Sequence, residues 1–274
     1  MNIPKITIIT ATYNSVKTLE QTIFSVIEQT YDNIEYIIID GGSTDGTIDI
    51  IKRYADKIAY WISEPDKGIY DAFNKGIAVA TGDYIEFLGS DDSLYAKDTI
   101  KKIVAEIDED TDILSGGVIC VNERQKIEKF ADSQTPLKEN RMVPHQGMFV
   151  RTLLLKNRMF DLQYKIASDY ESFLYFLLEK KVVLKSIDYP VAYYSLSGVS
   201  TIADVVNLEN EKIMQRYGLS VIKDKNENGY RNAIKTFLKA THIFIPIKYI
   251  LDTHFRGWRK HHCEWEYCRW CGRK

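Results

Sequence analysis

Short apolar runs rich in β-branched residues recur along the first 90 residues, and stretches with helical spacing separate them. The runs are residues 5–10, 36–40, 58–63 and 84–88. Runs of this length that are almost continuously apolar are typical of strands covered on both faces. After the first run, Leu19 and Ile23 recur at the spacing of one helix face, which predicts a helix over residues 14–29. The alternation predicts βαβ units, and therefore an α/β fold with a mostly parallel central sheet flanked by helices.

The pattern is less regular after residue 95 but still alternates. Strands are expected over residues 113–121, 125–130, 182–184 and 191–194, and helices over residues 48–55, 69–79, 99–107, near Leu153 and from Ile166 onward. Beyond about Asp204 the pattern is helical. We therefore predict one α/β domain over residues 1–203 and a helical carboxyl-terminal extension over residues 204–274. The domain would divide into a first half at about 1–95 and a second half at about 96–203.

The composition is that of an ordinary globular protein. Of the 274 residues, 45% are hydrophobic and 27% are charged, and the formal net charge is −2. A charge this close to neutral argues against a nucleic-acid partner, because affinity for phosphate backbones comes from excess Lys and Arg. The sequence starts without the layout of a signal peptide, and no apolar run is long enough to span a bilayer. Because four cysteines also make no extracellular disulfide framework, we expect a cytoplasmic protein.

Aspartates stand at the carboxyl ends of three predicted strands. Asp40 ends one strand, Asp66 follows another, and the adjacent Asp91 and Asp92 follow a third. In an open α/β sheet these strand ends meet at one edge, where ligands bind. Paired carboxylates there suit Mn²⁺ or Mg²⁺, which keep coordination positions open for substrate phosphates. The alternatives are structural, because Asp91 and Asp92 could cap a helix starting near Leu94 and Asp40 could begin a turn.

Several short motifs occur in the order and spacing of a known family. They are Thr12-Tyr13-Asn14, Asp40-Gly41-Gly42-Ser43-Thr44-Asp45-Gly46-Thr47, Asn74-Lys75-Gly76, Gly82-Asp83-Tyr84 and Ser90-Asp91-Asp92. On these motifs the chain resembles the family 2 glycosyltransferases, whose catalytic domain has the GT-A fold, over roughly residues 3–200. The segments Ser63 to Asp71 and His145-Gln146 are similar to a colanic-acid-type branch that makes bacterial surface polysaccharides.

A donor pocket is expected at the edge where the strands end. Its residues would be Ala11, Thr12, Tyr13, Asp40, Asp66, Asp71, Lys75 and Asp91. The resemblance implies that the segment from Ala11 to Tyr13 lines the nucleoside pocket and that Asp40 accepts a hydrogen bond from the base. Asp71 and Lys75 lie on a helix that would face the pocket, although a solvated helix face explains them as well. Asp45 is left out, because it can cap the following helix.

The resemblance also implies a metal site and a catalytic base. Asp91 and Asp92 fill the family's metal motif, with Asp92 favoured as the direct ligand, and Ser90 stands where many relatives carry an aspartate. Asp169 matches the family's catalytic base, although Ser168 replaces the usual glutamate before it. The alternative for Asp169 is a plain helix cap.

The expected function is inverting, metal-dependent transfer of a sugar from a nucleotide-diphospho-sugar donor. Uridine is the expected nucleotide because it is common in the family, and the acceptor would be a saccharide or a lipid-linked saccharide in surface polysaccharide assembly. His145 and Gln146 would contact the acceptor or the phosphates, unless they form an ordinary turn after Pro144. The alternatives are a sugar-nucleotidyltransferase and a non-catalytic partner protein that keeps the fold.

The carboxyl-terminal extension carries two further signals. Residues 231–260 are basic and apolar, which fits contact with an anionic membrane at the inner face of the cell membrane or, alternatively, a helix pair packed on the domain. The last residues include potential zinc ligands, namely His261, His262, Cys263, Cys268 and Cys271. Their spacing is not that of a standard zinc finger, so we predict a disordered or redox-inert tail and keep zinc as the alternative.

Overall fold

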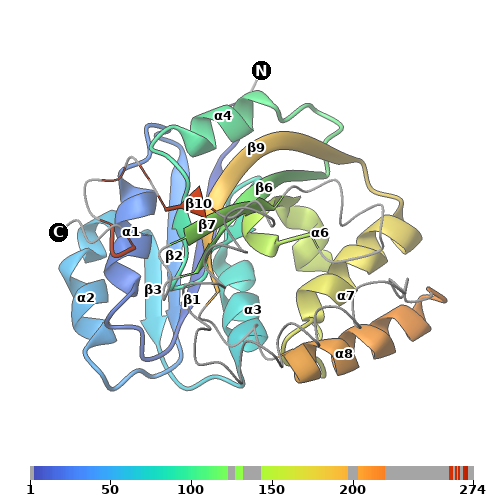
Figure 1. The fold of residues 1–274 in the computed structure, drawn as a ribbon, viewed down its shortest axis with the longest axis horizontal. Helices are drawn as coiled ribbons and strands as arrows, with labels where there is room; N and C mark the ends of the chain where they lie inside the picture. The colour runs from blue at the N-terminus through green and yellow to red at the C-terminus, as the bar shows by residue number, and fades with distance from the viewer. Residues whose placement is uncertain are drawn as a thin grey trace, which may run out of the picture.

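The computed structural model describes residues 3–122, 127–131, 143–196 and 203–219, and near the carboxyl end residues 259–261, 263, 265 and 268–270. Its strands are β1 (Ile6–Thr12), β2 (Ile34–Asp40), β3 (Tyr60–Ser63), β4 (Tyr84–Phe87), β5 (Ser93–Leu94), β6 (Ile113–Asn122), β7 (Ile127–Ala131), β8 (Met148–Arg151), β9 (Leu184–Ser195) and β10 (Arg259–Lys260). Its α-helices are α1 (Leu19–Ile27), α2 (Thr47–Arg53), α3 (Ile69–Val79), α4 (Thr99–Ala105), α6 (Thr152–Asn157), α7 (Ser168–Leu174) and α8 (Ala203–Arg216). The described strands form one curled sheet with helices around it (Figure 1).

The first four strands are parallel and adjacent, in the order β3-β2-β1-β4. Register pairs Thr12 of β1 with Asp40 of β2, and Asp40 with Ser63 of β3, so these three strands end level with one another. Strand β4 pairs with β1 as far as Phe87, which brings the loop that carries Asp91 to the same edge. The predicted parallel sheet with its aspartate-bearing edge is confirmed here.

The other half of the sheet is mixed. Strand β8 is antiparallel to both β4 and β6, and β9 runs parallel to β6. The prediction of two short strands at 182–184 and 191–194 is wrong, because β9 is one strand from Leu184 to Ser195. Polar residues in the middle of β9 interrupt the apolar pattern of a strand, yet residues on both sides of them pair with β6. The register shifts at Gly116–Gly117, where the sequence predicts a bulge or a close backbone contact.

Helix α1 begins at Leu19, later than the apolar spacing predicts. The backbone N–H of Asn14 donates to Ser43 Oγ at 2.7 Å, and that of Ser15 donates to Thr47 Oγ1 at 2.8 Å. Asn14 also has a φ of 49°, which a helix does not allow. These bonds tie two loops of the ligand edge together, and the backbone turns into α1 only after Ser15, whose carbonyl accepts the N–H of Leu19 at 3.0 Å.

Two apolar clusters cover the two faces of the sheet. Successive residues of a strand point to opposite faces, so Ile8 packs in the cluster formed with α1, α2 and α4, whereas Ile9 packs in the cluster formed with α3, α6 and α7. Ile8 and Ile9 are both fully buried. This burial on both faces explains why the strands are almost continuously apolar.

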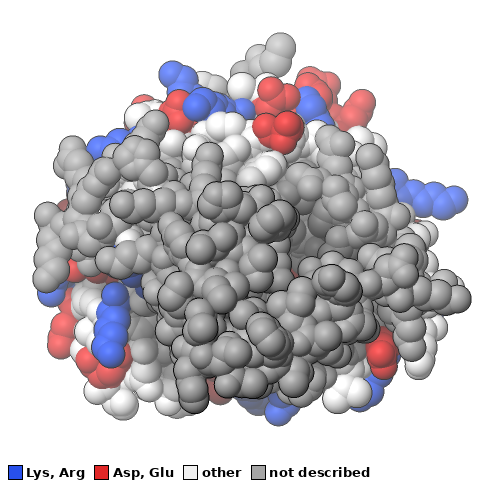
Figure 2. Space-filling view, in the orientation of Figure 1, with Lys and Arg blue, Asp and Glu red and all other residues white. Residues whose placement is uncertain are grey.

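Charges of both signs share the surface near α4. In Figure 2, acidic and basic side chains alternate along the upper edge, where α4 lies in Figure 1. Lys102 pairs with Asp98 at 2.9 Å, and Lys97 pairs with Glu28 at 3.2 Å. Among the described helices, none is both long and apolar enough to cross a bilayer.

Candidate active site

A cleft of about 670 Å³ opens at the carboxyl edge of β1 and β4. This is the size of an ordinary small-molecule site. Eight of the predicted site residues line it: Ala11, Thr12, Tyr13, Asp66, Asp91, Asp92, His145 and Gln146. The other four do not, and they are Asp40, Asp71, Lys75 and Asp169.

One end of the cleft is lined by Tyr13 and Asp66, and Gly41 lies against both side chains. Tyr13 is 64% exposed, and a Cβ at position 41 would lie 2.6 Å from Asp66 Oδ2 and 3.4 Å from the Tyr13 ring. Glycine thus leaves room for an aromatic ring and a carboxylate to face the same space. Thr12 Oγ1, buried nearby, has no hydrogen-bond partner in the described part of the chain. A buried polar atom beside a cleft is a natural contact for a bound ligand.

Asp40 does not face this space. Its side chain is fully buried and accepts hydrogen bonds from the N–H groups of Gly42 and Ser43 and from the hydroxyls of Ser43 and Ser63. The expected contact between Asp40 and a nucleobase is therefore not supported, and the alternative of a turn-forming aspartate describes the structure. Asp40 shapes the loop that carries Gly41 instead.

Asp71 and Lys75 also act on a loop. Asp71 accepts a hydrogen bond from the backbone N–H of Lys67 at 3.0 Å. Lys75 Nζ pairs with Glu64 at 2.8 Å and donates to the Pro65 carbonyl at 3.1 Å. Both residues therefore hold the turn between β3 and α3, and the expectation that they contact the donor directly is not supported. Their effect on the cleft passes through Asp66, which lies in that turn.

Asp92 is buried at the far side of the cleft. Gln146 Nε2 donates to its Oδ2 at 3.0 Å, and the backbone N–H of Ser195 donates to its Oδ1 at 2.8 Å. Burial and then the charge of Asp91 raise the pKa of Asp92 to about 7, although both hydrogen bonds oppose the shift. The alternative of a helix cap is wrong, because the residues after Asp92 form strand β5.

The residues at Asp91–Asp92 fit a hard divalent cation. They supply oxygen donors on adjacent positions at the wall of the cleft. Their mutual repulsion, which raises the Asp92 pKa, is what a cation would relieve. Gln146 and Ser195 orient the Asp92 carboxylate, as outer hydrogen bonds do for metal ligands.

Asp169 forms a tight pair with His145 beside the cleft. His145 Nδ1 lies 3.0 Å from Asp169 Oδ2, and the Tyr70 hydroxyl donates to Asp169 Oδ1 at 2.8 Å. Burial would raise the Asp169 pKa, but the hydrogen bond and charge of His145 hold it below its ordinary value. Burial would lower the His145 pKa, but Asp169 raises it above its ordinary value. Each group of the pair therefore favours the charged form of the other.

The role of a plain helix cap does not describe Asp169. Helix α7 has Ala167 at its cap position, and no side chain caps it. The Asp169 carboxylate accepts the backbone N–H of the next residue, Tyr170, and it also contacts residues of α3 and of the turn at His145–Gly147. Its side chain is 14% exposed and that of His145 is 21% exposed, so His145 presents more of the pair to the cleft.

Sequence reasoning missed three contributors to the site. They are Tyr70, which binds Asp169; Ser195, whose backbone holds Asp92; and Arg269, whose guanidinium donates to the Asp91 carbonyl. Tyr70 lies next to Asp71 on α3, the helix that was expected to face the pocket. The orientation of this helix was therefore the signal that could have identified Tyr70. Nothing in the local pattern marks the other two, because their partners lie more than 100 residues away along the chain.

The chain is similar to known glycosyltransferases. Residues 7–169 match the family described as Glycosyl transferase family 2. A PGL/p-HBAD biosynthesis glycosyltransferase from Mycobacterium bovis is 31% identical over 230 residues, which cover 81% of this chain and 90% of the relative. An uncharacterized glycosyltransferase from Haemophilus influenzae is 44% identical over 105 residues, which cover 37% of this chain and 42% of the relative.

Solved structures agree in fold. S. aureus TarS superposes with a TM-score of 0.60 and 26% identity, covering 77% of this chain but only 40% of TarS. Residues 1–349 of TarS, solved in complex with UDP, superpose with a TM-score of 0.59 and 26% identity, covering 77% of this chain and 65% of that chain. The mannosyltransferase PcManGT from Pyrobaculum calidifontis, solved with GDP-Man and Mn²⁺, superposes with a TM-score of 0.58 at 19% identity, covering 72% of this chain and 58% of that one.

Proposed function

This chain belongs to glycosyl transferase family 2, and we propose that it transfers a sugar from a nucleotide-diphospho-sugar bound in the cleft. The acceptor would be a saccharide or a lipid-linked saccharide in surface polysaccharide assembly, and the anomeric configuration would be inverted. The observation that carries the proposal is the convergence of Tyr13, Asp66, Asp92 and His145 on one cleft, with Asp169 bound to His145 beside it. The relatives are glycosyltransferases, so the alternative of a sugar-nucleotidyltransferase is set aside. A colanic-acid-type pathway is supported by sequence motifs alone, because the one relative named above with its pathway is a PGL/p-HBAD biosynthesis glycosyltransferase.

The nucleoside would bind at the end of the cleft formed by Tyr13 and Asp66. A planar base can stack on the exposed Tyr13 ring, and the Asp66 carboxylate can accept an N–H from the base edge. Uracil offers such an N–H, and a relative in fold, TarS, binds UDP. Asp66 thus takes the role that the sequence assigned to Asp40.

Asp91 and Asp92 would hold Mn²⁺ or Mg²⁺. Bound there, the cation supplies positive charge for the diphosphate leaving group. The chain's own part is to keep both carboxylates in place, which Gln146 and the Ser195 backbone do for Asp92. Thr12, with its unpartnered buried hydroxyl, would donate to a donor oxygen.

Asp169 would accept the proton of the acceptor hydroxyl as that oxygen attacks the anomeric carbon. A base must be ionised to do so, and the pairing with His145 keeps Asp169 ionised near neutral pH. The Tyr70 hydroxyl fixes one oxygen, so the carboxylate is oriented before an acceptor arrives. A single displacement of this kind inverts the anomeric configuration.

The test is a thermal-shift panel of UDP, GDP, CDP and dTDP, with and without Mn²⁺, on wild type, Asp92→Ala and Asp66→Ala. We expect a metal-dependent shift with UDP that Asp92→Ala abolishes and Asp66→Ala weakens, since a ligand stabilises the state it binds. Asp56→Ala is the control, because Asp56 is exposed and lies away from the cleft in the α2–β3 connection.

Transfer itself is tested by release of nucleoside diphosphate from the donor that gives the shift. Loss of release in Asp92→Ala, with release retained in Asp56→Ala, is the expected result. No shift with any nucleotide and no release would favour the non-catalytic partner protein.

A further inference from the structure

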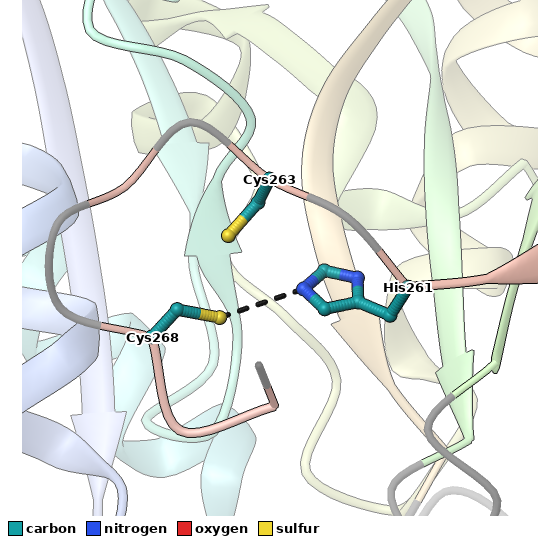
Figure 3. A group of neighbouring side chains, drawn as sticks. All are labelled: His261, Cys263 and Cys268. Atoms are coloured by element: carbon teal, nitrogen blue, oxygen red, sulfur yellow. Dashed lines mark hydrogen bonds between the residues drawn. The ribbon is translucent and has the colours of Figure 1, made fainter. Parts of the chain in front are cut away.

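Three buried side chains with soft ligand atoms meet near the carboxyl end. His261, Cys263 and Cys268 each offer one ligand atom, and these atoms all lie within 4.8 Å of one another. Cys268 Sγ and His261 Nε2 are 3.4 Å apart, and Figure 3 shows the two sulfurs and the imidazole directed toward a common point. The prediction of a disordered tail is wrong for these residues, because all three are at most 6% exposed.

The separations suit a tetrahedral metal centre. With Zn–S of about 2.3 Å and Zn–N of about 2.0 Å, neighbouring ligand atoms lie roughly 3.5–3.8 Å apart. The observed distance of 3.4 Å between Cys268 Sγ and His261 Nε2 is close to this value. The other ligand atoms lie within 4.8 Å of one another, so they need to approach only slightly to reach it. Two thiolates would also balance the charge of a divalent cation, which makes the buried centre neutral overall.

The surroundings are apolar and keep water away. Cys263 and Cys268 pack with Trp265, Trp270 and Tyr193, and the Tyr193 and Trp270 rings lie 5.1 and 5.4 Å from the His261 ring. Apolar packing alone does not explain why two thiols and an imidazole converge in this cluster. Three of the four cysteines in the chain fall within its last 12 residues, although Cys271 lies outside the described residues.

We propose that His261, Cys263 and Cys268 bind a structural Zn²⁺ ion that fixes the carboxyl-terminal segment to the catalytic domain. In the sequence, Cys271 follows Cys268 at the Cys-x-x-Cys spacing common in zinc sites, although Cys271 lies outside the described residues. This site differs in chemistry from Asp91–Asp92, because sulfur and nitrogen ligands select zinc whereas carboxylates select magnesium or manganese.

The fixed segment supports the loop that carries Asp91. Trp265 Nε1 donates to the Leu94 carbonyl at 3.0 Å, just after that loop. The backbone N–H of Arg269 donates to Gln21 Oε1 at 3.0 Å, and its guanidinium donates to the Asp91 carbonyl at 2.5 Å. Zinc bound by Cys263 and Cys268 would therefore stabilise the loop that carries Asp91 in the wall of the cleft.

The experiment measures the zinc content of the full-length protein, purified with reduced thiols and without added zinc. We expect about one zinc per chain by elemental analysis. Cys268→Ser should lose most of it, whereas Cys120→Ser should retain it, since Cys120 lies on β6 outside the cluster. Zinc retained at wild-type level in soluble, folded Cys268→Ser would overturn the proposal.

A second measurement does not depend on a variant. Wild type stripped of zinc and loaded with Co²⁺ should show a thiolate-to-cobalt charge-transfer band and the strong visible bands of a tetrahedral ion. Adding Zn²⁺ should abolish both, and stripping should lower the melting temperature. A wild-type protein that holds no zinc and gives no such bands with Co²⁺ contradicts the inference, whether or not the donor site binds nucleotide.

Discussion

At the scale of single residues, Asp92 in the cleft and Asp169 beside it have opposite electrostatic environments. Asp92 is buried beside another carboxylate, so its pKa is raised to about 7. Asp169 lies against His145 and Tyr70, so its pKa is lowered. The raised pKa of Asp92 fits the proposed cation site, and the lowered pKa of Asp169 fits the proposed role of a base, which must be ionised.

Asp92→Asn should be more favourable at pH 8 than at pH 5 in the absence of divalent cations. The folded-state pKa of Asp92 lies above its ordinary value of 3.8, so the folded state binds more protons and loses stability as pH rises from about 3.8 to about 7. Asparagine removes that cost, but it can accept only one of the two hydrogen bonds from Gln146 and Ser195, and this loss is the same at both pH values. We expect the melting temperature of the variant relative to wild type to rise by several degrees from pH 5 to pH 8, measured by thermal melts. A difference from wild type that does not change between these pH values would contradict the assignment.

Asp169→Asn should retain donor binding and lose transfer. Asparagine has nearly the same shape but cannot take up the acceptor proton, and general-base catalysis contributes about 10²–10⁴-fold in rate. We expect kcat to fall by at least about 100-fold while the UDP–Mn²⁺ thermal shift stays as in wild type. Asp56→Asn, at an exposed position outside the cleft lining, serves as the control. Near-normal kcat in Asp169→Asn would move the base elsewhere.

At the scale of elements, the cleft depends on how helices and turns approach the sheet. The His145–Asp169 pair joins the turn at His145–Gly147 to α7, and Tyr70 of α3 joins the same carboxylate. Gly76 lets α3 lie close on β1, because a Cβ there would lie 2.6 Å from Ile9 Cγ2. The position of Tyr70 and Phe73 in the cleft follows from that close approach.

Replacing His145 by Asn should remove a pH-dependent part of the stability. The His145 pKa is raised from 6.5, so its contribution is present below pH 6.5 and is lost as pH rises through the folded value. The Asp169 pKa is lowered from 3.8, so its contribution is present above pH 3.8 and is lost as pH falls. The difference in melting temperature from wild type should therefore be largest between pH 4 and 6.5 and shrink above it. An equal difference at pH 5.5 and 9 would argue against the ion pair.

Gly76→Ala should destabilise the protein although alanine favours helices. The added methyl group collides with a β-branched side chain of the core, and overpacking of this kind costs about 1–3 kcal/mol. Urea unfolding measures the loss. Val79→Ala on the same helix is partly exposed and should change stability less. A stabilised Gly76→Ala would show that α3 can move away from β1.

At the scale of the whole molecule, the two predicted halves of the domain share one sheet and both cores. Strand β4 of the first half pairs with β8 of the second. The cluster around Ile8 includes Leu114 and Phe149, and the cluster around Ile9 includes Val150. The boundary near residue 95 is therefore one of chain order alone, and the core crosses it.

A fragment of residues 1–95 should not fold alone. It lacks β8, which covers the open side of β4, and it lacks the second-half members of both clusters. We expect the fragment to show little near-UV circular dichroism, and the full chain to lose near- and far-UV signals in one transition. A folded, UDP-binding fragment would establish an independent nucleotide-binding unit.

The order of strands and helices follows from local pattern, because periodicity records which side of each element is buried. The apolar pattern over residues 5–88 thus predicted the parallel sheet, and the family motifs identified Asp91, Asp92 and Tyr13 at its edge. A strand pattern fails where polar residues interrupt it, as in β9, because pairing with β6 and not side-chain burial holds that part of the strand.

Only the tertiary structure decided which side chains face the cleft and with which partners. Asp40 turns inward to its own loop while Asp66 faces the cleft, and both stand near the ends of parallel strands in the sequence. His145 meets Asp169, and Cys268 meets His261, through irregular backbone whose course local periodicity does not encode. Side-chain direction at such positions is set by hydrogen bonds between loops far apart in the chain, and those form only when the fold is complete.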